Sequence, residues 1–72
     1  MVKRIALIGS GHIARDLYRK ISFVKELELY LVASKNLKSE GMIEAKNYSK
    51  KISDKGIDSV LNFSNEIDIV ID

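Results

Sequence analysis

Residues 5–14 read I-A-L-I-G-S-G-H-I-A, and this stretch decides the fold. The continuous apolar run Ile5–Ile8 is typical of a strand that is covered on both faces in a parallel sheet. Two glycines end the strand, and apolar residues then recur three or four positions apart, which predicts an amphipathic helix. The apolar positions of that helix are Ile13, Ala14, Leu17, Ile21 and Val24. A strand that leads through G-x-G-x-x-A into a helix is the setting in which this motif binds a dinucleotide.

Each small residue of the loop has a physical role in such a site. Gly9 permits the tight turn out of the strand, Gly11 lets the backbone approach a pyrophosphate, and Ala14 keeps the helix close to the sheet. The amides of Ser10–Ile13 would then point at the phosphates, and the helix dipole would contribute about 0.3–1 kcal/mol. The competing interpretation is that the two glycines only make a tight turn between a strand and a helix.

His12 and the residues after the second predicted strand bear on the choice of cofactor. His12 stands where an imidazole would bond a phosphate or a ribose, or it is an ordinary loop residue. About twenty residues after the glycines, where a carboxylate normally binds the ribose 2′-hydroxyl, the chain has Ser34, Lys35 and Asn36. Lys35 is either a solvated residue or a partner for a 2′-phosphate. The residues therefore predict a nicotinamide dinucleotide and leave the choice between NAD and NADP open.

The rest of the chain alternates predicted strands and helices. The expected strands are residues 27–33, 50–53 and 67–72, and the expected helices are residues 39–49 and 57–63. Ser39 and Glu40 favour the start of the first of these helices, and Lys46, Lys50 and Lys51 favour its end. The order β-α-β-α-β-α-β predicts an α/β fold, the parallel sheet of a Rossmann half-domain with strand order 3-2-1-4 and helices on both faces. Because a strand stops at the last residue, we expect the N-terminal part of a truncated domain, without its catalytic domain.

The composition excludes several classes of function. The chain of 72 residues is 46% hydrophobic and 31% charged, as in an ordinary globular domain, and its net charge of +2 includes no dense basic block for nucleic acid. No apolar stretch is long enough for a membrane span or a signal peptide, so we expect a cytoplasmic protein. Without cysteine the chain has no thiol nucleophile and no thiolate metal site, and we assign it no catalytic residue and no metal ligand.

Three segments of the chain carry a resemblance to a known family. Residues 3–17 read K-R-I-A-L-I-G-S-G-H-I-A-R-D-L, against K-V-A-I-I-G-S-G-N-I-G-T-D-L in that family. Residues 33–42 read A-S-K-N-L-K-S-E-G-M, against A-G-R-N-x-x-S-x-G-M. Residues 56–61 and 66–72 read G-I-D-S-V-L and E-I-D-I-V-I-D, against G-I-D-x-L-L and D-I-D-I-V-F-D. In this order and spacing the segments resemble the N-terminal, NAD-binding part of the acylating acetaldehyde dehydrogenases.

The resemblance implies a function for the full-length protein. It implies that Ser10–Ile13 contact the NAD pyrophosphate, and that acetaldehyde and coenzyme A are converted to acetyl-CoA. The implied mechanism uses a cysteine thiolate that lies outside these residues, so this chain alone would be inactive. The resemblance further implies a homo-oligomer, 4-hydroxy-2-oxovalerate aldolase as a partner, and a place in aromatic hydrocarbon catabolism.

Three departures and two rival interpretations accompany the resemblance. His12 replaces the family's asparagine, Ala14 its third glycine, and Ser34-Lys35 its glycine-arginine pair. Alanine is an accepted variant, and lysine keeps the positive charge but loses the bidentate fork of arginine. The first rival is another Rossmann NAD(P)-dependent dehydrogenase or reductase. The second is a domain that senses a nucleotide without turning it over.

Overall fold

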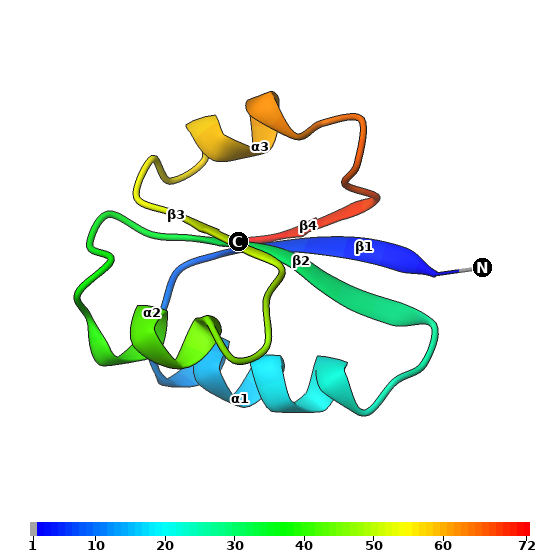
Figure 1. Ribbon diagram of the computed structural model, residues 1–72, viewed down its shortest axis with the longest axis horizontal. Coiled ribbons are helices and arrows are strands. Elements are labelled where there is room, and N and C mark those ends of the chain that lie inside the picture. The colour runs from blue at the N-terminus through cyan, green and yellow to red at the C-terminus, as the bar shows by residue number, and fades with distance from the viewer. Residues whose placement is uncertain (1) are drawn as a thin grey trace.

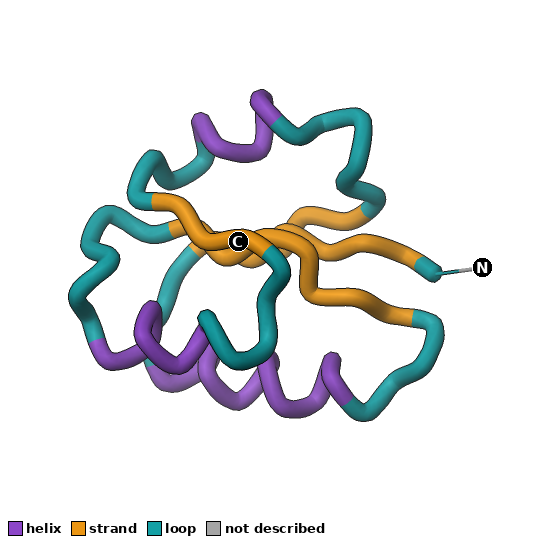
Figure 2. Tube along the Cα trace, in the orientation of Figure 1, coloured by secondary structure: helices purple, strands orange, loops and turns teal. Residues whose placement is uncertain are grey.

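Four strands form one parallel sheet with helices on both faces in the computed structural model, which describes residues 2–72 (Figure 1). The elements are β1 (Lys3–Ile8), α1 (His12–Ser22), β2 (Leu27–Ala33), α2 (Glu40–Ala45), β3 (Lys51–Ser53), α3 (Asp58–Asn62) and β4 (Ile69–Ile71). The strand order is β3-β2-β1-β4, with α1 and α2 on one face and α3 on the other, so that the strands form a middle layer (Figure 2). The predicted α/β fold and the strand order 3-2-1-4 are confirmed.

The strand β1 lies inside the sheet, between β2 on one edge and β4 on the other. Its residues Ile5, Ala6 and Leu7 are at most 2% exposed. Ile5 and Leu7 pack into the core on one face of the sheet and Ala6 into the core on the other, because side chains alternate along a strand. A strand buried on both faces explains why residues 5–8 are continuously apolar.

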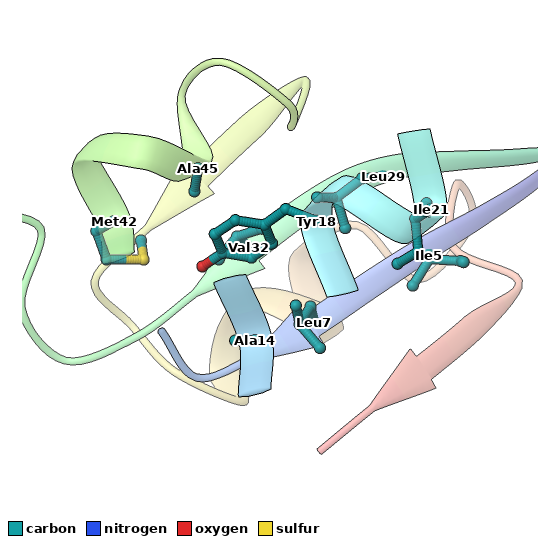
Figure 3. Packing of buried hydrophobic residues seen from close by; sticks show 9 residues of the cluster. All are labelled: Ile5, Leu7, Ala14, Tyr18, Ile21, Leu29, Val32, Met42 and Ala45. Atoms are coloured by element: carbon teal, nitrogen blue, oxygen red, sulfur yellow. The ribbon is translucent and has the colours of Figure 1, made fainter. Parts of the chain in front are cut away.

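The larger core lies between the sheet and the two helices α1 and α2 (Figure 3). Its buried members are Ile5, Leu7, Ala14, Tyr18, Ile21, Leu29, Val32, Met42 and Ala45. Tyr18 is fully buried, its ring centroid lies 6.2 Å from that of Tyr48, and burial raises the pKa of its hydroxyl. On the opposite face a smaller core of Ala6, Tyr30 and Leu31 is covered by the α3 segment, where Phe63 meets Tyr30 edge to face. Each face of the sheet therefore has its own apolar layer.

The buried face of α1 differs from the predicted one at both ends. Ile13 is 81% exposed and Val24 is 41% exposed, so neither of these predicted apolar positions lies on the buried face. The buried face runs through Ala14, Tyr18 and Ile21, at spacings of four and three, and Ile13 lies one position off this stripe. Val24 comes after the helix has ended at Ser22. With eleven residues, α1 is the longest helix of residues 2–72, and none of these helices has the length and apolar character needed to cross a bilayer.

The helix α2 is shorter than predicted, because it ends at Ala45 and not at Ser49. Lys46 is its C-cap, whereas Lys50 lies beyond the helix and Lys51 opens β3. The amide of Lys50 donates to the carbonyl of Leu29 over 3.1 Å, so the chain must leave the helix early to reach the edge of β2. A lysine-rich segment that looked like a helix end is thus largely the entry to a strand.

The last strand is also shorter than predicted, covering three residues of the expected 67–72. Asp68, just before the strand, is bonded to β1: its amide donates to the Arg4 carbonyl over 2.8 Å, and its carboxylate accepts from the Arg4 amide over 2.8 Å. Ile69 and Val70 are 40% and 44% exposed, because β4 is an edge strand of the four-stranded sheet. Its β-branched sequence correctly indicated a strand, but it did not indicate that the side chains of this strand would be partly exposed.

The two cores predict a sharp contrast between two leucines. Replacing Leu31, which is fully buried in β2, with alanine should lower the free energy of unfolding by about 2–5 kcal/mol or abolish folding. Leu61→Ala, at a position 74% exposed on α3, should change it by less than about 0.5 kcal/mol. Chemical denaturation of both variants tests this, and equal losses would contradict the described packing.

Candidate functional site

The loop between β1 and α1 leaves the sheet through a backbone conformation that glycine favours. Gly9 has φ of +119°, and its amide donates to the carbonyl of Ala33 at the end of β2 over 2.7 Å. Gly11 is the N-cap of α1, and no side chain caps this end of the helix. The first turn of α1 contains no acidic residue. The amides at the start of α1 are therefore left for an external acceptor.

This loop borders a cleft of about 500 Å³ at the carboxyl ends of β1 and β4. The lining residues are Leu7, Ile8, Gly9, Ser10, Gly11, His12, Ile13, Ala14, Leu17, Ile71 and Asp72. The chain runs outward from β1 through β2 to β3 and then returns to the other side of β1 as β4. The cleft thus lies where the strand order reverses, which is where open α/β sheets bind their ligands.

The predicted site residues fall into two groups. Gly9, Ser10, Gly11, His12 and Ile13 all line the cleft, and His12 and Ile13 present exposed side chains. The two weaker candidates after β2 are outside its lining. Ser34 is linked to the loop, because the hydroxyl of Ser10 donates to its Oγ over 3.3 Å, and Lys35 is exposed.

Two residues at the start of α2 also belong to the surroundings of the loop, although the motif did not indicate them. The Oγ atoms of Ser39 and Ser10 lie 3.2 Å apart. A Cβ atom on Gly41 would collide with the carbonyl oxygen of Ser10, so only glycine fits at this position of α2. Both belong to the S-x-G-M segment that carries the family resemblance. That segment was the only sequence signal for these two residues, and it did not indicate what they do physically.

Arg15 is tied to α2 and is therefore not a free cation at the loop. Its Nε donates to Oε1 of Glu44 over 2.8 Å, and its guanidinium lies 3.7 Å from the carboxylate of Glu40. The hydrogen bond to Glu44 is the main reason why the pKa of Arg15 is raised. Arg19 approaches the same Glu44 carboxylate at 3.5 Å. These ion pairs join α1 to α2.

The fold and the loop first define a class, because a parallel sheet with this strand order and a G-x-G-x-x-A turn is a Rossmann half-domain. The sequence is more specific. The chain is 39% identical over 70 residues to an acetaldehyde dehydrogenase of Roseiflexus, and 36% and 33% identical over 69 residues to those of Pectobacterium atrosepticum and Bacillus cereus. Each match covers 96% of this chain, which spans 23% of the relative's length. No family model matches. The chain is thus a homologue of part of the acetaldehyde dehydrogenases, which confirms its resemblance to enzymes of that name.

The contact between α2 and the loop predicts the sign of one substitution. Alanine at Gly41 should gain about 1 kcal/mol of helix propensity, but the collision with Ser10 should cost more, so we expect a net loss of about 1–2 kcal/mol. Denaturant unfolding of Gly41→Ala measures this, with Ile43→Ala on the exposed side of α2 as the control. A Gly41→Ala variant more stable than the unaltered protein would show that the contact is absent.

Proposed function

We propose that this chain is the NAD-binding part of an acetaldehyde dehydrogenase that transfers the acyl group to coenzyme A. The observation that carries the proposal is the uncapped start of α1 beside the cleft at the strand-order reversal. The homology to acetaldehyde dehydrogenases supports an oxidoreductase parent, and a Rossmann sheet supports a nucleotide cofactor.

The loop has the room that a pyrophosphate needs. A Cβ atom built on Gly11 meets nothing within 4 Å, so the space over its backbone is open to a ligand. In the proposed complex the amides of Ser10–Ile13 donate to the phosphate oxygens, and the positive end of the α1 dipole adds to the attraction. His12, exposed at the rim, would contact the phosphate or the ribose. No side-chain charge is required, which agrees with the pairing of Arg15 to α2.

The end of β2 would lie near the ribose of the adenosine. Ser34 and Lys35 follow this strand in place of the carboxylate that commonly binds the 2′-hydroxyl. We propose NAD as the cofactor because the chain resembles an NAD-binding family, and the positive charge of Lys35 leaves NADP as the alternative to be tested. When bound, the nicotinamide supplies the hydride acceptor for aldehyde oxidation.

The chain contributes binding, and we assign the covalent chemistry to the remainder of the protein. Residues 2–72 contain no group of three histidine, cysteine or acidic side chains that could hold a metal ion, and the sequence has no cysteine. In the proposed reaction NAD, held by the amides of Ser10–Ile13, would supply the hydride acceptor for acetaldehyde oxidation, and a thiolate outside this chain would pass the acyl group to coenzyme A. The proposed aldolase partner and homo-oligomer also concern the full-length protein.

Gly11→Val tests the loop directly. Because a side chain here would project into open space, the variant should fold normally. The valine side chain would then occupy the place of the pyrophosphate. We expect the Kd for NADH, measured by fluorescence titration, to rise at least about tenfold, a change of about 1.4 kcal/mol. Circular dichroism provides the control for folding. An unchanged Kd would remove the loop from the site.

The reaction of the full-length protein separates the proposal from its rivals. With acetaldehyde and NAD, we expect NADH to form only when coenzyme A is present, and to form faster with NAD than with NADP. NADH binding without turnover would indicate a sensing domain. NADH formation at the same rate with and without coenzyme A would indicate a different dehydrogenase.

A further inference from the structure

Three serine hydroxyls from three parts of the chain meet behind the loop. Ser10 donates to Oγ of Ser34 over 3.3 Å, and Ser10 and Ser39 lie 3.2 Å apart at their Oγ atoms. The amide of Met42 donates to Oγ of Ser39 over 3.3 Å. A hydroxyl has one hydrogen, and that of Ser10 goes to Ser34, so Ser39 must donate to Ser10. The chain of hydrogen bonds therefore runs in one direction, from Ser39 through Ser10 to Ser34.

The helix α2 is held in place by contacts other than these serine hydrogen bonds. Met42 is fully buried in the larger core, and Glu44 is bonded to Arg15 of α1. Gly41 brings the backbone of α2 into contact with the carbonyl of Ser10. A helix anchored at the core and at α1 thus supports the loop by one hydroxyl and one close backbone contact.

Ser39 and Gly41 stand behind the loop and not in the ligand's place. Ser10 lines the cleft of about 500 Å³, whereas neither Ser39 nor Gly41 does. Both line a second hollow of about 270 Å³ at the starts of α1 and α2, on which Ser10, Gly11 and His12 also border. Ser39 is connected to the larger cleft through Ser10, with which it shares a hydrogen bond and which lines that cleft.

We propose that Ser39 is a positioning residue for the phosphate loop: it caps α2 and donates to Ser10, and so holds the loop in the shape that binds a dinucleotide. The proposal rests on the proposed function, since it assumes that the larger cleft takes the nucleotide. It gives the S-x-G-M segment a role, because its serine donates to the loop and its glycine admits the loop's carbonyl.

Ser39→Gly in the full-length protein separates positioning from simple capping. Glycine is an adequate N-cap, so helix stability should fall by only a few tenths of a kcal/mol, while the donor to Ser10 is lost. We expect the Kd for NADH to rise about two- to tenfold, the range for one hydrogen bond. Ser39→Thr keeps the hydroxyl and should restore the original Kd. Ser64→Gly, at an exposed serine beyond α3, is the matched control and should leave the Kd unchanged.

A spectroscopic measurement without ligand provides the second readout. In Ser39→Gly the ¹⁵N-amide resonances of Ser10 and Gly11 should move, whereas a pure capping role would confine changes to α2. Either an unchanged Kd or unmoved Ser10 and Gly11 resonances would overturn the positioning role. If the unaltered protein binds no NADH, the proposed function itself is refuted and this inference falls with it. If the unaltered protein binds and the variant binds equally well, only the positioning role fails.

Discussion

The structure depends on the burial of one strand. β1 is paired on both edges and covered on both faces. The turn that follows it can therefore form only beyond its end. At the carboxyl end the chain must turn sharply under the sheet to form α1, and the positive φ of Gly9 makes that turn possible. The same turn leaves the start of α1 facing the cleft at the carboxyl ends of β1 and β4 with its amides uncapped. The requirement of the fold and the proposed binding of an anion thus arise from one local conformation.

Much of this arrangement could be predicted from the sequence because the signals are local. An apolar run, two glycines and a helical period are enough to place β1, the loop and α1, and the alternation of elements gives the strand order. The ends of elements were less predictable. Ile13 fits the apolar period but lies off the buried stripe, and α2 stops early because Lys50 must reach β2. Such outcomes depend on tertiary contacts between segments. The periodicity of apolar residues in the sequence carries no information about those contacts.

The support of the loop by α2 could not be predicted for the same reason. Ser10 and Gly41 are 31 positions apart in the sequence, and nothing in either segment alone says that their backbones touch. The resemblance to acetaldehyde dehydrogenases marked the S-x-G-M segment as characteristic. The structure shows that its serine and its glycine contact Ser10 of the loop. In the proposed function the chain divides its work accordingly: backbone amides hold the phosphates, α2 holds the loop, and catalysis belongs to the remainder of the protein.

A crystal structure of the full-length protein with NADH bound tests the central claim most directly. The account predicts a pyrophosphate within hydrogen-bond distance, about 2.7–3.2 Å, of the amides at Ser10–Ile13, with Gly11 beneath it. A nucleotide bound elsewhere, with solvent over these amides, would contradict it.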